Sequence, residues 1–122
     1  MPNAQFLEFV HHNLVTENEG DLTSTIAADV LVIPTDQPYV AKTTGNDAEA
    51  LTLADGEPGQ ILIINLVTAG GGTGTLTPAT ATGWSTILFL GAKDQAVLFY
   101  ANDTLGWFIL SVSGTDGPPV VS

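Results

Sequence analysis

Short apolar runs separated by turn-forming residues recur along the chain from Asp21 onward. The last three lie in the segments STILFLG, QAVLFYAND and LGWFILSVSG, which follow one another at nearly equal spacing. Thirteen glycines and seven prolines suit many tight turns rather than long helices. Regularly spaced short strands with turns between them are typical of antiparallel sandwiches and barrels. We therefore expect an all-β domain over residues 21–115, an antiparallel β-sandwich or a jelly-roll-like fold.

Three segments of this domain predict particular strand positions. The run from Ile61 to Val67 is apolar on both faces of a strand, which suits the centre of a sandwich. Alternation in residues 48–55 places Leu51 and Leu53 inward. The threonine-rich segment TLTPATATGW predicts an edge strand, because Pro78 has no N–H to donate to a neighbour.

The segment TAGGGTGTLTP, residues 68–78, resembles a phosphate-binding loop at first sight. Such a loop needs a lysine after its last glycine and a helix whose N-terminal N–H groups face the anion. Here Gly74 is followed by Thr75, Leu76, Thr77 and Pro78, a strand-like sequence. We interpret the glycines as a turn that reverses the chain between two strands, with φ above zero.

The charge balance excludes several partners. Thirteen acidic residues face two lysines (Lys42 and Lys93) and no arginine, which gives a net charge of −11. Nucleic acids and anionic membrane surfaces are bound through cations that this chain lacks, so we expect neither as a partner. Only Asp94, Asp103 and Asp116 are acidic beyond Glu57. A nearly uncharged half-chain is expected to pack against copies or partners.

No motif for catalysis, a metal or a cofactor is found. The chain has no cysteine, which excludes disulfides and thiolate chemistry. His11 and His12 are adjacent, so on a strand they point to opposite faces and cannot chelate one metal. Ser85 in GWS lacks the flanking glycines of a nucleophile elbow. Acid pairs such as Asp47 and Glu49 are interpreted as solvated strand ends. We expect no enzyme, no metal and no cofactor.

The two termini differ from the central domain. Residues 1–20 predict a short amphipathic helix, an extended arm or an ordinary first strand, and Phe6, Val10 and Leu14 share one helical face. They lack the pattern of a signal peptide, so synthesis in a cytoplasm is expected. Residues 116–122 predict an extended tail, since Pro118 and Pro119 block regular structure. The candidate arm residues that would reach another subunit or a larger surface are Phe6, Leu7, Phe9, Val10 and Leu14.

Aromatic residues gather in the C-terminal third. Trp84 and Trp107 each follow a glycine at the start of an apolar run, and Phe99 lies in a run between them. We interpret Trp84, Phe99 and Trp107 as parts of the core or of a seam between subunits. A sugar-stacking platform formed by the two tryptophans is the alternative.

Residues 47–114 resemble a module of tailed-phage structural proteins. The resemblance is carried by the strand-turn entry ALTLADGEPGQ, a Gly/Thr hairpin leading into TLTP, the strand GWSTILF and the closing segment DQAVLFYANDTLGWFILS. A small β-protein with these features is similar to the capsid decoration (cement) proteins of tailed bacteriophages, cyanophages among them.

The resemblance implies a structural protein located on the outer capsid surface of the virion. It implies a homotrimer whose partner is the major capsid protein, with the residues around Phe6–Val15 as the capsid-facing arm. A receptor-binding or glycan-binding module of a tail fibre or baseplate is the alternative function.

Overall fold

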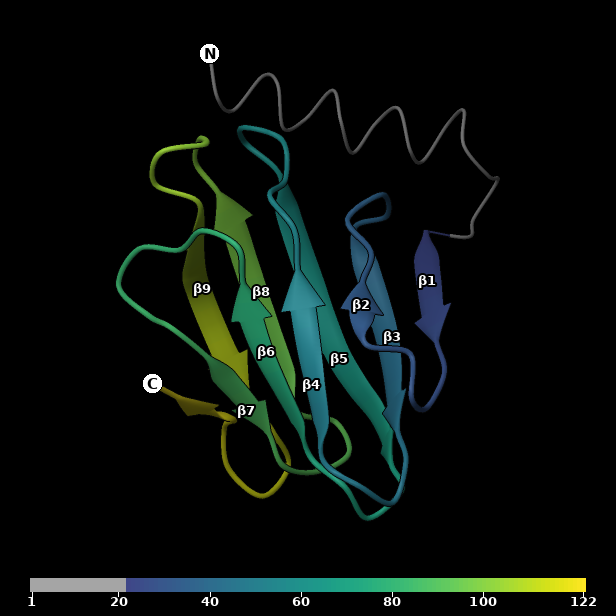
Figure 1. The fold of residues 1–122 in the computed structure, drawn as a ribbon. Coiled ribbons are helices and arrows are strands. Elements are labelled where there is room, and N and C mark those ends of the chain that lie inside the picture. The colour runs from purple at the N-terminus through teal and green to yellow at the C-terminus, as the bar shows by residue number, and fades with distance from the viewer. Residues whose placement is uncertain (1–21) are drawn as a thin grey trace.

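The computed structural model describes residues 22–122, which fold as two stacked β-sheets (Figure 1). Sheet A contains, in spatial order, β1 (Thr23–Ile26), β3 (Tyr39–Thr44), β5 (Ile61–Ala69), β8 (Gln95–Tyr100) and β9 (Trp107–Ser113). Sheet B contains, in spatial order, β10 (Val120–Val121), β7 (Ile87–Phe89), β6 (Gly74–Pro78), β4 (Glu49–Leu53) and β2 (Val32–Ile33). The described part of the chain has no helix. The expected all-β sandwich is confirmed.

The strand pairing is mixed, so the expectation of a purely antiparallel sandwich was wrong. From β1 to β6 each connection leads from one sheet to the other, so the chain re-enters the same sheet after two connections. The strand that it forms on re-entry runs in the same direction as the previous strand of that sheet. The neighbours β1–β3, β3–β5, β2–β4 and β4–β6 are therefore parallel, whereas β6–β7, β7–β10, β5–β8 and β8–β9 are antiparallel. Jelly rolls are antiparallel. Alternation of apolar residues has the same period in both kinds of ladder, so the sequence pattern could not distinguish them.

Two strand positions test the sequence predictions directly. The strand β5 lies at the centre of sheet A, as expected from its apolar run. The strand β6 was predicted at an edge, yet it lies at the centre of sheet B. On the β7 side only Gly74, Thr75 and Leu76 are paired. Pro78 lies beyond these residues, so no backbone N–H is needed from it for a hydrogen bond to β7. Proline is therefore tolerated in a central strand here, because it is the last residue of that strand.

The core fills the space between the two sheets. Along β5, Leu62, Ile64 and Leu66 are buried and alternate with residues that are half buried or exposed. Leu51 and Leu53 on β4 face them from sheet B, as predicted. The fully buried set is completed by the following residues: Ile33, Val40, Leu76, Ile87, Phe89, Ala96, Leu98, Tyr100 and Trp107.

The glycine-rich segment between β5 and β6 is a turn, as predicted, but it is not a hairpin. It joins strands of different sheets, and no helix follows it. The N–H of Gly70 donates to the carbonyl of Thr44 (3.0 Å), and the N–H of Gly72 donates to the carbonyl of Gly45 (2.9 Å). A Cβ on Gly72 would clash with the backbone of Asp47. The glycines therefore allow two connections to pack backbone against backbone, and Gly71 has φ of 106°.

The C-terminal residues do not extend away from the sandwich. Val120 and Val121 pair antiparallel with Leu88 and Ile87 and form the outermost strand of sheet B. The N–H groups of Ser85 and Thr86 both donate to the carbonyl of Ser122. The tail expected over residues 116–122 is thus extended and adds an edge strand to the domain. The predicted N-terminal arm lies outside the described residues.

Candidate functional site

The outer side of sheet A is built from large apolar side chains. Paired residues on neighbouring strands point to the same side of a sheet, and the buried Leu62 and Leu98 mark the inner side. The outer side therefore carries Phe108, Phe99 and Ile61 in one row. The next row contains Val97, Ile63 and Tyr39, with the polar Ser111 and Thr23 at its two ends. We call the six apolar residues the apolar face. All six are half buried, and their exposed parts form one continuous surface across β3, β5, β8 and β9.

This face carries no charged side chain in a chain with a net charge of −11. The row that follows it along the strands contains only Ser113, Gln95, Asn65, Ala41 and Thr25. The Asn65 amide donates to the Tyr39 hydroxyl (3.0 Å), which fixes both side chains at the border of the face. The Oδ1 atom of Asn65 is buried without a hydrogen-bond partner. Sandwich sheets usually present polar side chains outward, so this face is unusual.

The outer side of sheet B is different. Its two central strands, β4 and β6, carry Thr52, Thr77, Ala50 and Thr75 there. Apolar residues extend these rows only on the outer strands: Val32 beside Thr52, and Leu88 and Val120 beside Thr75. The central strands of sheet B are therefore mostly polar on the outer side, whereas those of sheet A carry the apolar face.

A second apolar surface lies at the edge of the sandwich formed by β2. Val30, Leu31 and Val32 are consecutive, and 46%, 42% and 63% of their surfaces are exposed. We call these three residues the apolar ridge. The strand β2 has two residues and is the outermost strand of sheet B, to the right of β4 in Figure 1. Sequences usually protect exposed edge strands with charges, so three exposed apolar residues in a row are unusual at such an edge.

A buried ion pair holds the loop that presents the ridge. Lys42 is 1% exposed, and its Nζ atom donates to the carbonyl of Ala27 (2.8 Å), the carbonyl of Val30 (2.7 Å) and Oε1 of Glu49 (2.7 Å). Its three N–H groups are thus all used. Because Lys42 is on sheet A and Glu49 is on sheet B, the pair also links the two sheets. Buried ion pairs add little net stability, and holding one specific loop conformation is a role they can serve.

The Glu49 carboxylate has further partners in the same loop region. Its Oε2 atom accepts from the N–H of Gly45 (2.6 Å) and from the N–H of Asp29 (3.3 Å). Asp29 has φ of 65°, a left-handed conformation that this contact helps to maintain. Burial alone raises the pKa of the Glu49 carboxyl. The hydrogen bonds from Lys42, Gly45 and Asp29 and the lysine charge outweigh burial, so the net pKa is lowered and the carboxylate stays ionised.

The prediction for Glu49 was therefore wrong, since it is no solvated strand end. Asp47, two residues earlier, is exposed as expected. Alternation explains the difference: Glu49 shares the inward side of β4 with Leu51 and Leu53. A charge at an inward position opposite the inward Lys42 was the signal in the sequence. It becomes visible only when the two strands are known to face each other.

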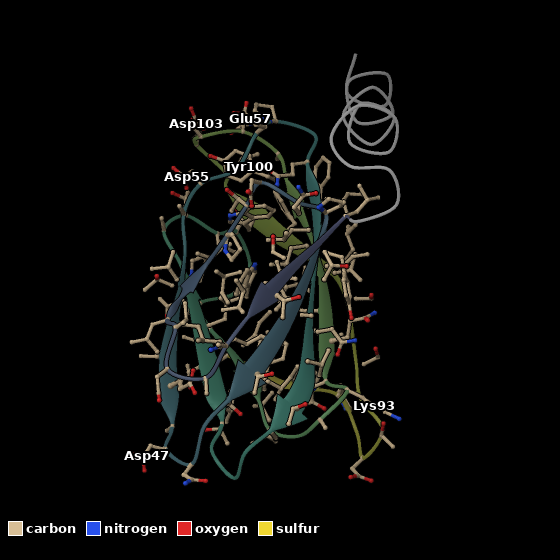
Figure 2. The ribbon with its side chains drawn as sticks, turned by 90° about the vertical axis from the view of Figure 1, so that its right-hand side faces the viewer. Asp47, Asp55, Glu57, Lys93, Tyr100 and Asp103 are labelled. Carbon is tan, nitrogen blue, oxygen red and sulfur yellow. The ribbon has the colours of Figure 1, made fainter. Side chains whose placement is uncertain are left out.

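Three acidic side chains, Asp55, Glu57 and Asp103, lie around Tyr100 at one end of the sandwich (Figure 2). Asp47 and Lys93 lie at the other end. The Tyr100 hydroxyl donates to Oδ1 of Asp103 (2.6 Å). Burial, this hydrogen bond and the negative charges of Asp103, Asp55 and Glu57 raise the pKa of the Tyr100 phenol. No group of three or more His, Asp or Glu side chains within residues 22–122 is placed to hold a metal ion.

The aromatic residues singled out from the sequence fall into two places. Trp107 is fully buried and Trp84 is 9% exposed, and both belong to the core. Their indole N–H groups donate to the carbonyls of Ala54 and Trp107 respectively. These two rings therefore offer no surface on which a sugar could stack. Phe99 lies on the apolar face and is half buried, so it is not a core residue.

The candidate arm residues Phe6, Leu7, Phe9, Val10 and Leu14 lie outside the described residues, as do His11 and His12. Sequence reasoning did not single out Tyr39, Ile61, Ile63, Val97 or Phe108 as surface residues. The signal was present for β5, whose residues are apolar at inward and outward positions alike. That pattern was interpreted as burial of β5 on both sides. Among residues 22–122, however, no further layer covers the outer side of sheet A, so the outward residues of β5 are partly exposed.

No family model, curated protein or solved structure matches this chain. Among the described residues, no helix is long and apolar enough to cross a membrane. The apolar face and the apolar ridge are therefore the features on which a function can be proposed.

Proposed function

We propose that this chain is a structural, non-enzymatic protein of a tailed-phage virion. It decorates the outer capsid surface as a homotrimer, binds the major capsid protein and stabilises the shell. The apolar face carries this proposal: an uncharged sheet surface of six large side chains on a strongly acidic protein fits a component of an assembly. The resemblance of residues 47–114 to decoration modules supplies the type of assembly.

Such a protein acts by binding and catalyses no reaction. A ligand that binds only the assembled shell stabilises that shell by mass action, and the effect grows with the number of sites filled. The acidic end around Tyr100 suits this role, since a high net charge keeps copies soluble before they reach the capsid. A glycan-binding function through Trp84 and Trp107 lacks support, because both rings are in the core.

The test is co-sedimentation of the purified chain with capsids of its own phage that lack it. We expect saturable binding, and we expect the double variant Phe6→Ser/Phe9→Ser to bind more weakly. Leu105→Ser is the matched control, because it removes an exposed apolar side chain (42% exposed) from a turn of the described domain. Wild-type chain that stays in the supernatant would refute the decoration function. Unchanged binding by the double variant would refute only the role of the arm.

A further inference from the structure

The apolar face and the apolar ridge lie on different parts of one molecule and differ in shape. The face is the broad outer side of sheet A, which lies behind sheet B in Figure 1, and the ridge lies at the β2 edge of sheet B. The face is formed by side chains in rows on four strands, whereas the ridge is three consecutive residues on one strand and its preceding loop. The ridge and the face are therefore two separate apolar surfaces rather than two halves of one patch.

The charge distribution favours a second copy of the chain as the occupant of both surfaces. Each copy has a net charge of −11, and one of its two lysines, Lys42, is buried in the pair with Glu49. Copies therefore repel one another wherever charged surfaces meet. Neither the ridge nor the face contains a charged residue, so these are surfaces at which two copies can make contact. Burying the ridge also removes the exposed edge strand.

We propose that the apolar ridge of one copy packs on the apolar face of the next copy, head to tail. Because the two surfaces differ, the contact is heterologous: it closes into a ring if the rotation between copies fits, and otherwise continues as a filament. A closed ring of three is the homotrimer of the proposed function, and the contact described here rests on that part of it. A face-to-face dimer would leave the ridge exposed.

The size of the face agrees with assembly through ring closure. The four strands of the face at about 4.8 Å spacing and its two rows of outward residues, about 7 Å apart, give a face of roughly 19 by 14 Å. A single contact of this size is smaller than the interface of a stable pair of proteins. In a closed ring each copy makes two such contacts, and the second contact forms at high effective concentration. Closure is therefore what makes the assembly stable.

The Lys42–Glu49 pair has a defined part in this contact. Its hydrogen bonds to the carbonyls of Ala27 and Val30 fix the loop from which the ridge projects. A ridge that is already ordered loses less conformational entropy on association. The ion pair is thus a positioning element for the contact and touches no partner itself.

The experiment uses two variants of the full chain, Val32→Asp on the ridge and Ile63→Asp on the face. Each puts a negative charge into an uncharged surface, so neither can form a new ion pair with the other. Leu90→Asp is the matched control, because Leu90 is 50% exposed and belongs to neither surface. Phe108→Asp, on the edge strand β9, is the second face variant if Ile63→Asp does not fold. Folding is checked by circular dichroism and tryptophan fluorescence.

Mass is measured by analytical ultracentrifugation over a range of chain concentrations. We expect the wild type and Leu90→Asp to self-associate. Each of the other variants should have a dissociation constant at least roughly tenfold higher. When the ridge variant and the face variant are mixed, one intact ridge and one intact face remain. A two-chain complex should therefore form at the highest chain concentrations, and it should be weaker than the wild-type assembly because no ring can close. Unmixed, neither variant should form it.

Three results would overturn the head-to-tail contact. They are a wild type that stays a single chain at every concentration, variants that associate as the wild type does, and a mixture that forms no two-chain complex even at the highest chain concentrations. If the variants keep their mass but lose capsid binding, the face belongs to the capsid and the contact proposed here is wrong. If the mixture forms the complex while the wild type fails to bind capsids, the contact stands and the decoration function falls.

Discussion

Replacing Lys42 by methionine tests how the buried ion pair acts. The change keeps the length of the side chain and removes the ammonium group, which is 1% exposed and donates three hydrogen bonds of 2.7–2.8 Å. The Glu49 carboxylate, 4% exposed, is then left charged and without its cation. Breaking a buried pair in this way costs about 3–5 kcal/mol. Typical domains are stable by only about 5–15 kcal/mol, so the loss would be a large part of the total.

A second substitution makes the prediction sharper. In Lys42→Met/Glu49→Gln the neutral amide replaces the unpaired carboxylate, and its oxygen can still accept from the N–H groups of Gly45 and Asp29. We therefore expect the double variant to be more stable than Lys42→Met alone, although a second residue has been changed. Glu49→Gln alone should be destabilised as well, because it leaves a buried ammonium group without its anion.

The assay is urea unfolding at equal chain concentration, followed by the fluorescence of the two core tryptophans, with the slope of each transition compared. Lys93→Met is the control, because Lys93 is exposed, and it should stay within about 0.5 kcal/mol of the wild type. A Lys42→Met variant within about 1 kcal/mol of the wild type would refute the reasoning. So would a double variant that is less stable than Lys42→Met.

Three further predictions concern stability. Because the pKa of Glu49 is lowered in the folded protein, its ionised carboxylate stabilises the fold at pH values above the ordinary pKa of 4.5. This stabilisation is lost as the pH falls through the lower pKa of the folded state. The stability difference between the wild type and Glu49→Gln should therefore shrink in acid. Because the pKa of Tyr100 is raised in the folded protein, its protonated phenol stabilises the fold at pH values below the ordinary pKa of 10.0. This stabilisation is lost as the pH rises through the higher pKa of the folded state. Above pH 10 the urea midpoint should therefore fall less steeply for Tyr100→Phe than for the wild type. Gly72→Ala should destabilise by roughly 2 kcal/mol or more because its Cβ meets the Asp47 backbone, whereas Gly91→Ala, with open space around it, should stay within about 0.5 kcal/mol; equal midpoints for the two would contradict this role of Gly72.

The strands were predictable from the sequence because alternation and turn residues are local signals. Leu51 and Leu53 face inward as their pattern indicates, and the central place of β5 follows from its apolar run. The pairing of β1 with β3 and of β2 with β4 was not predictable, since it depends on connections that cross between the sheets. No property of a single strand records which way its neighbour runs.

The candidate site was less predictable than the fold. Lys42 and Glu49 are seven positions apart and meet only because consecutive strands lie in opposite sheets. The apolar face combines residues of four strands. In the sequence, an apolar residue on the outer side of a sheet cannot be told from a buried one. The two differ only because residues 22–122 form no third layer outside sheet A. The ridge Val30–Val32 was visible as an apolar run, and its exposure depends on β2 being an edge strand.

Calorimetry of the capsid is the most direct test of the central claim that this chain stabilises a shell. Capsids that lack the chain are melted alone and with increasing amounts of the purified protein. We predict that the melting temperature of the shell rises with added chain until the sites are filled, as mass action requires. A shell that melts at the same temperature with a large excess of folded chain would contradict it.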